Sequence, residues 1–173
     1  MCSSDLDIAE ILSWYPDAKV VKIKVGGDLE LDIARIKNTL AINPNLLIRL
    51  DVNGGWSVAE AESSVARIID EVGIDSIQYI EQPVATLEEL RQLKLPIPVV
   101  GDEVIRKAHD PFALDLNGAV DILMLKVAPL GGIKRAMQIA AHHKLPVVVS
   151  SALESAVGIS HGDRKSTRLN SSH

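Results

Sequence analysis

A regular alternation of short aliphatic segments with segments of helical periodicity is the feature that most constrains how this chain can fold. Strands that alternate with helices form right-handed βαβ units, so the pattern predicts an α/β fold built on a parallel sheet. We expect strands over residues 20–25, 46–53, 76–83, 97–103, 121–129 and 146–153. We expect helices over residues 7–18, 29–42, 57–73, 87–93, 110–118 and 132–144.

The composition supports buried parallel strands wrapped by helices. Hydrophobic residues make up 47% of the chain and aromatic residues only 3%, so aliphatic side chains dominate the expected core. The net charge of −5 is spread along the sequence, and no basic patch or polybasic helix indicates a nucleic-acid or membrane partner. The apolar segments are too short to span a bilayer, no signal-peptide pattern is present, and the single cysteine, Cys2, allows no internal disulfide. We therefore expect a cytoplasmic protein.

Two folds are consistent with the alternation, an open doubly wound sheet and a (β/α)₈ barrel. A doubly wound sheet would carry a glycine-rich phosphate turn after its first strand, but the sequence VGGDLELD at residues 25–32 lacks the spacing G-x-G-x-x-G. A barrel places its chemistry at the carboxyl ends of several strands, where the loops converge. Six strands are too few to close such a barrel, so we expect an incomplete TIM-type (β/α) barrel.

Charged side chains occur near the carboxyl ends of successive expected strands. Taken singly, each has a structural explanation: lysines block a sheet edge or extend to solvent, an aspartate caps a turn, and a glutamate pairs with an arginine. Taken together they form an ordered series of cation, anion, anion, anion and cation, which a parallel sheet does not need for its stability. We interpret them as one site, together with the serine pair that ends the last strand. In chain order the residues are Lys22, Lys24, Asp51, Glu81, Asp102, Lys126, Ser150 and Ser151.

Three carboxylates at one site repel one another unless a cation lies among them. An all-oxygen set of ligands suits a hard divalent ion, with Mg²⁺ as the first choice and Mn²⁺ as the second. No histidine or cysteine occurs at these strand ends, which argues against zinc. Such a metal can hold a substrate carboxylate. A lysine can remove the proton on the adjacent carbon when nearby positive charge lowers the pKa of the lysine toward neutral. Lys22 would supply that charge to Lys24, which lies on the same face of the strand.

These motifs together resemble those of the enolase superfamily, specifically its muconate-lactonising-enzyme-like branch. The resemblance implies that Asp51, Glu81 and Asp102 bind Mg²⁺ and that Asn53 supports these ligands. It also implies the mechanism general to that superfamily, in which a base removes the proton beside a carboxylate and a metal stabilises the resulting enediolate. The matching motifs are KIK at residues 22–24, DVNGGW at 51–56, IEQP at 80–83, GDE at 101–103 and LKVAPLGG at 125–132.

Within that branch, the segment PVVVSSALESAVGISHG at residues 146–162 resembles the one found in actinobacterial o-succinylbenzoate synthases. The implied reaction is the dehydration of a cyclohexadiene carboxylate, SHCHC, to 2-succinylbenzoate in menaquinone biosynthesis. Lys24 would act as the base and then as the acid that expels water, while Lys126 would stabilise the enediolate from the opposite face. The residues that the resemblance assigns to substrate binding are Lys22, Ser150 and Ser151.

Two other functions stay open at this point. An N-succinylamino acid racemase, or another cycloisomerase or epimerase of the same branch, would use the two lysines on opposite faces of one carbon. A barrel module without catalytic activity would use Mg²⁺ for its structure alone. For both enzymatic readings, the expected partner is a small-molecule carboxylate substrate.

The two ends of the chain depart from the aliphatic pattern. Residues 163–173, DRKSTRLNSSH, correspond to a translation of DNA that resembles a common sequencing-library adapter, and residues 1–6, MCSSDL, match the opposing adapter. We interpret both ends as adapter read-through and take residues 7–162 as a partial enolase-type C-terminal barrel domain. The resemblance implies a capping domain and two further barrel strands outside this sequence. We therefore expect the chain by itself to be marginally stable and inactive.

Overall fold

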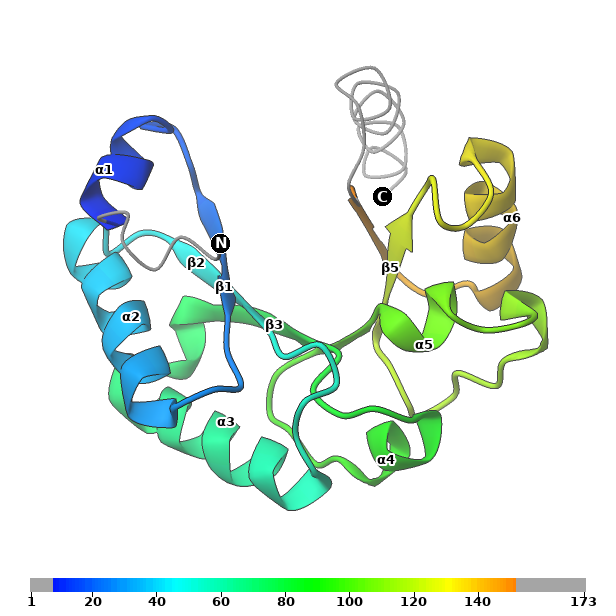
Figure 1. Cartoon of the computed structure of the whole chain (residues 1–173), viewed down its shortest axis with the longest axis horizontal. Helices are drawn as coiled ribbons and strands as arrows, with labels where there is room; N and C mark the ends of the chain where they lie inside the picture. The colour runs from blue at the N-terminus through cyan, green and yellow to red at the C-terminus, as the bar shows by residue number, and fades with distance from the viewer. Residues whose placement is uncertain (1–7, 152–173) are drawn as a thin grey trace.

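The computed structural model describes residues 8–151, so the predictions for residues 1–6, 152–162 and 163–173 fall outside the described part. Within this part, six parallel strands form one sheet in which each strand pairs with the next along the chain. The sheet curls into part of a barrel, with α2, α3 and α6 along its outer side (Figure 1). This confirms the expected incomplete barrel. The strands are β1 (Val20–Lys24), β2 (Leu47–Asp51), β3 (Ile77–Glu81), β4 (Val99–Gly101), β5 (Ile122–Lys126) and β6 (Val147–Ser150).

Helices precede and connect these strands, mostly where the apolar periodicity predicts them. Within residues 8–151, no helix combines the length and the apolar character that are needed to cross a membrane. The helices are α1 (Ile8–Ser13), α2 (Leu29–Ile42), α3 (Val58–Val72), α4 (Leu87–Gln92), α5 (Glu103–Arg106) and α6 (Ile133–His143). The described residues also form two 3₁₀ turns, η1 (Ile74–Ser76) and η2 (Pro111–Ala113).

Polar residues at the helix ends explain why the helices begin and end where they do. The side chain of Asp28 accepts hydrogen bonds from two backbone N–H groups in the first turn of α2. Ser57 and Glu60 form a reciprocal capping box at the start of α3. This helix ends at Gly73, whose φ of 81° suits glycine because a side chain would be strained there.

The sequence predicts a helix over residues 110–118, and here the prediction is wrong. Only the single turn η2 forms, and the chain then runs through a turn in which the Asp115 side chain accepts a hydrogen bond from Asn117 N. Gly118 follows with a φ of 66°. Asp, Asn and Gly favour turns over helix interiors, which explains the break. A short helix, α5, forms instead directly after β4, where we expected the strand to end without one.

Alternate residues of each strand face two different environments, as the two-residue period of a strand requires. Residues on the outer face, such as Ile23 and Ile48, pack with the helices in the main hydrophobic core. On the inner face, Tyr79, Val100 and Met124 form a second, smaller cluster. The charged residue two positions after each of these three therefore continues the inner face toward the carboxyl ends of the strands. Those charged residues are Glu81, Asp102 and Lys126.

Candidate functional site

The carboxylates of Asp51, Glu81 and Asp102 lie at the carboxyl ends of three neighbouring strands. Asp51 and Glu81 are register partners across β2 and β3, and Asp102 directly follows β4. All three residues are buried, with relative exposures of 8%, 0% and 0%. Parallel strands end on the same side of a sheet, so these three anions share one rim, which we call the carboxylate rim.

The ammonium of Lys22 bridges the first two members of the carboxylate rim. Its Nζ lies 2.9 Å from Asp51 Oδ2 and 2.6 Å from Glu81 Oε2. Burial opposes the charge of this lysine, but its hydrogen bonds to Glu81 and Asp51 outweigh burial and raise its pKa. Burial also raises the pKa of Glu81, and the nearby cation only partly offsets this effect. Lys22 is thus held as a cation between two carboxylates.

The ammonium of Lys126 takes the equivalent place on the other side of Glu81. It donates a hydrogen bond of 2.6 Å to Asp102 Oδ2 and lies 3.8 Å from Glu81 Oε1. Only 13% of the Lys126 side chain is exposed, so this ion pair is poorly screened by solvent. By their contacts, carboxylates and ammonium groups therefore alternate in the order Asp51, Lys22, Glu81, Lys126 and Asp102.

The side chains of the rim suit a hard divalent cation by their chemistry. All three donors are carboxylates, and Glu81 Oε1 is buried and accepts no hydrogen bond from residues 8–151. In the same residues, no three His, Cys, Asp or Glu side chains stand in the arrangement of a formed metal site. Lysine ammonium groups instead lie against the carboxylate oxygens. As a set of oxygen donors, the three carboxylates fit such an ion.

The side chain of Lys24 lies at the same end of β1 but stays apart from the ion pairs. Lys24 is exposed and is the register partner of Asp51. Within residues 8–151 its side chain makes no hydrogen bond or ion pair, although its backbone carbonyl accepts a hydrogen bond from Arg35. The structure therefore brings Lys22, rather than Lys24, against the carboxylates. The ammonium of Lys24 remains available to a ligand from solvent.

The serine pair lies at the far end of the sheet. Ser150 ends β6 and is the register partner of Lys126, which places it next to the rim. Ser150 is half-buried, whereas Ser151 is exposed. Most of residues 146–162, the segment whose resemblance suggested the reaction, lie outside the described part. The role of the two serines in substrate binding therefore stays a prediction.

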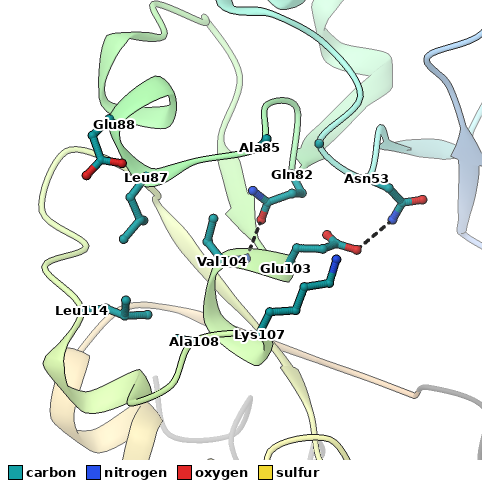
Figure 2. A pocket seen from close by; sticks show the side chains of 11 residues that line it. Asn53, Gln82, Ala85, Leu87, Glu88, Glu103, Val104, Lys107, Ala108 and Leu114 are labelled. Atoms are coloured by element: carbon teal, nitrogen blue, oxygen red, sulfur yellow. Dashed lines mark hydrogen bonds between the residues drawn. The ribbon is translucent and has the colours of Figure 1, made fainter.

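A polar network that the sequence analysis did not identify in full supports the rim from outside. Asn53, with a φ of 53°, donates from its backbone N–H to Asp51 Oδ1 at 3.3 Å. Its side chain donates to Glu103 Oε1 at 3.2 Å (Figure 2). The same glutamate oxygen accepts a hydrogen bond of 2.6 Å from Arg106. Arg106 in turn donates to Asp102 Oδ1 at 3.1 Å. The network thus links the two outer carboxylates of the rim, and the role of Asn53 in supporting a metal ligand stays a prediction.

Gln82 anchors the start of α5 behind the rim. It is fully buried, and its backbone has an unusual φ of 40°. Its side-chain oxygen accepts a hydrogen bond from the backbone N–H of Val104 (Figure 2). The same oxygen accepts from the backbone N–H of Asp102, and the side-chain amide donates to Val84 O at 2.8 Å. In the sequence, the position of this glutamine directly after the predicted ligand Glu81 was the feature that could have indicated its role. Two of its three partners, Asp102 and Val104, lie far along the chain at the start of α5, so local pattern could not identify them.

A cavity of about 360 Å³ adjoins this network, among α4, α5 and the loops after β2 and β3 (Figure 2). Its lining includes the apolar side chains of Leu87, Val104 and Leu114 and the charged side chains of Glu88 and Lys107. None of the three carboxylates of the rim lines it. Asn53, Gln82 and Glu103 of the network do line it, so the cavity lies beside the rim and shares its supporting residues.

Comparison with known proteins shows which sequences the chain resembles. Residues 10–161 match the family model described as "Enolase C-terminal domain-like". The chain is 45% identical over 160 residues to the o-succinylbenzoate synthase of Mycobacterium tuberculosis, and the alignment covers 90% of this chain and 48% of the relative. The chain thus spans about half the length of the curated relatives it matches.

Solved structures share the fold. Muconate cycloisomerase from Pseudomonas fluorescens superposes with a TM-score of 0.75 at 25% sequence identity, over 92% of this chain and 47% of its own. MenC from Desulfotalea psychrophila superposes with a TM-score of 0.77 at 22% identity, over 97% of this chain and 50% of its own. At 22% identity the second similarity concerns the fold alone.

Proposed function

The chain belongs to the enolase C-terminal domain-like family, and from that premise we propose that its carboxylate rim is part of the active site of an o-succinylbenzoate synthase. The observation that carries the proposal is the gathering of three buried carboxylates with Lys22 and Lys126 at one rim. The 45% identity to a synthase of that name supports the choice of reaction. Because the chain spans about half of that relative, the activity is proposed for a longer protein that contains residues 7–162.

Asp51, Glu81 and Asp102 would hold Mg²⁺, with Mn²⁺ as the alternative, because three carboxylates suit a hard ion. When bound, the ion would neutralise charge on the substrate carboxylate and so make the proton on the adjacent carbon more acidic. The buried oxygen of Glu81 that accepts no hydrogen bond within residues 8–151 supports this assignment. Asn53 would keep Asp51 in place through its backbone N–H.

The two lysines would act on the substrate from opposite sides. Lys24 would take the proton as the C–H bond breaks, and the electron pair would move into the carboxylate to give an enediolate. Lys126, held at the rim by Asp102, would stabilise the added negative charge with its ammonium. The C–O bond would then break, and the departing hydroxyl would take the proton back from Lys24 and leave as water, giving 2-succinylbenzoate. Substrate contacts are assigned to Lys22, Ser150 and Ser151.

A racemase or epimerase of the same branch is the second candidate, because the presence of both Lys24 and Lys126 also suits it. Such an enzyme would take a proton from one face of a carbon and return it on the other, which needs a base on each side. The likeness to muconate cycloisomerase supports keeping this alternative, since that name indicates a different reaction on a similar fold.

A chimera tests the proposal, with residues 7–162 replacing the matching segment of the Mycobacterium tuberculosis synthase. We expect the chimera to convert SHCHC to 2-succinylbenzoate in the presence of Mg²⁺, and the chain by itself to be inactive. Lys24→Ala should lower turnover by about 10²–10⁴-fold, the usual contribution of a general base. The control Lys19→Ala, which alters an exposed lysine beside the same strand, should leave turnover unchanged.

Other outcomes of the chimera assay would contradict the proposal in different ways. Unchanged turnover of SHCHC in the Lys24→Ala chimera would remove our assignment of the base. Racemisation of N-succinylamino acids without dehydration of SHCHC would favour the second candidate. Mg²⁺ binding without either activity would indicate a barrel module that uses the ion for its structure alone.

A further inference from the structure

We infer that Asp32 and Arg35, in the first two turns of α2, position Lys24 for its role as the base by holding the backbone at the end of β1. The inference rests on the proposed function, because it takes Lys24 as the group that removes the proton. It deepens that proposal by assigning positioning roles to two residues outside the predicted set of site residues.

The place of the Lys24 ammonium depends on the backbone that carries it. Lys22 and Lys126 are held by hydrogen bonds to carboxylates of the rim. Lys24 is exposed, and within residues 8–151 its side chain makes no hydrogen bond or ion pair. Such a side chain is placed only by the position of its Cα and by its rotamers. A displacement of about 1 Å at a reacting group can lower the rate by about 10²-fold, so the backbone at Lys24 matters for turnover.

The backbone carbonyl of Lys24 faces the open edge of the sheet. Val25 N donates to Asp51 O at 2.9 Å, so the backbone of Val25 faces β2. Backbone groups of successive strand residues point to opposite sides, and the carbonyl of Lys24 therefore points away from β2. Within residues 8–151, no strand pairs with this edge of β1. Arg35 Nη1 donates to the carbonyl at 3.0 Å and so supplies the partner that a strand would give.

Asp32 joins Arg35 to the loop that follows β1. Its Oδ1 accepts a hydrogen bond of 2.9 Å from Arg35 Nη1, and its Oδ2 accepts one of 2.9 Å from Gly26 N. The carboxylate is buried, with a relative exposure of 4% for the residue, so these hydrogen bonds are the compensation that its burial requires. Asp32 and Arg35 thus fix the backbone on both sides of Val25, and we call the pair the α2 clamp.

The loop that the α2 clamp holds also lies close to the loop after β2. A side chain at Gly26 would place its Cβ 3.3 Å from Val52 Cγ1 and 3.7 Å from Trp56 Nε1. The loop is therefore confined between the clamp on one side and these two side chains on the other. Lys24, two residues before Gly26, is held at the start of this confined segment.

A double-mutant cycle in the chimera tests the inference. Arg35→Gln should lower kcat for SHCHC by about tenfold, through a displacement of the base, and leave KM unchanged. In the Lys24→Ala background the same substitution should leave the residual turnover unchanged, because no base remains to be positioned. Arg35→Lys should retain most of the kcat, since an ammonium can still donate to the carbonyl and to Asp32. The control Arg67→Gln removes the same charge from an exposed ion pair on α3 and should leave kcat unchanged in both backgrounds.

The cycle separates positioning from a merely structural role, because a loosened fold would lower turnover in both backgrounds alike. Equal fractional losses in the two backgrounds, or no loss in either, would overturn the inference. If the residual turnover of Lys24→Ala is too low to measure, the split between kcat and KM in Arg35→Gln decides. A rise in KM that accounts for the lost activity would then overturn the inference.

Hydrogen exchange of the full chain gives a readout that does not depend on turnover. In Arg35→Gln and in Asp32→Asn, peptides that contain Gly26 should exchange faster than in the unmutated chain, because the clamp no longer protects this loop. Equal exchange rates would overturn the inference. If circular dichroism shows that Asp32→Asn does not fold, Arg35→Gln decides, since the Arg35 side chain is 46% exposed. Unchanged turnover of the Lys24→Ala chimera would instead refute the base in the proposed function.

Discussion

Lys126 donates a hydrogen bond of 2.6 Å to Asp102, although the two residues lie 24 positions apart and belong to different βα units. The contact exists because β4 and β5 are adjacent and parallel, so their carboxyl ends meet. With Lys22 on the other side of Glu81, it produces a row of alternating charges in which each ammonium faces two carboxylates. Removal of either cation would leave a buried carboxylate without its partner, which would destabilise the folded chain.

Lys126→Ala in the chimera is expected to lower kcat for SHCHC by about 10²–10³-fold, because the charge that develops on the substrate loses its electrostatic partner. Lys134→Ala is the matched control, since Lys134 is an exposed lysine on the helix that follows β5. Steady-state kinetics would measure both. A kcat for Lys126→Ala equal to that of the control would contradict the assignment.

MgCl₂ is expected to raise the melting temperature of the unmutated chain but not that of Glu81→Gln. A ligand that binds only the folded state stabilises it, and Glu81 lies between the other two carboxylates of the rim. Glu71→Gln, which alters an exposed ion pair with Lys37, should respond to Mg²⁺ like the unmutated chain. Thermal melts followed by circular dichroism provide the measurement. Equal stabilisation of Glu81→Gln by Mg²⁺ would show that the ion binds elsewhere.

The raised pKa of Lys22 predicts a specific loss of stability at alkaline pH. Its folded-state pKa lies above the ordinary value of 10.5, so its contribution to the free energy of unfolding is complete below pH 10.5. That contribution is lost as the pH rises through the folded-state pKa. In urea unfolding between about pH 8 and 12, Lys22→Met should show a shallower alkaline decline than the unmutated chain. If the free energies of unfolding of the two proteins fell in parallel as the pH rose, the predicted contribution of Lys22 would be ruled out.

Ser57→Ala is expected to lower the free energy of unfolding by about 1 kcal/mol, because it removes the side-chain cap of α3. Ser63→Ala is the control within the same helix. Its exposed hydroxyl binds only carbonyls of the preceding turn, and alanine is the better helix former at that position. Urea denaturation would compare the two. An equal effect of both substitutions would show that the cap contributes nothing.

Local pattern in the sequence was sufficient to predict much of the architecture. Apolar periodicity predicts the helix over residues 29–42 and a strand over residues 46–53, and the structure has that helix and a strand over Leu47–Asp51. The pattern failed after β4, because a helix of four residues is too short to show periodicity. It failed again at 110–118, where turn-forming residues interrupt an apolar spacing that resembles a helix.

The sequence by itself determined that acidic and basic side chains end successive parallel strands, because that depends only on the position of each residue within its own βα unit. Only the tertiary structure decided which of these side chains touch. Lys24 is the register partner of Asp51. Lys22, which precedes it on the same face of β1, is nevertheless the lysine that contacts both Asp51 and Glu81. Its long side chain extends up the inner face to the buried carboxylates, and such a contact depends on strand register and side-chain length together.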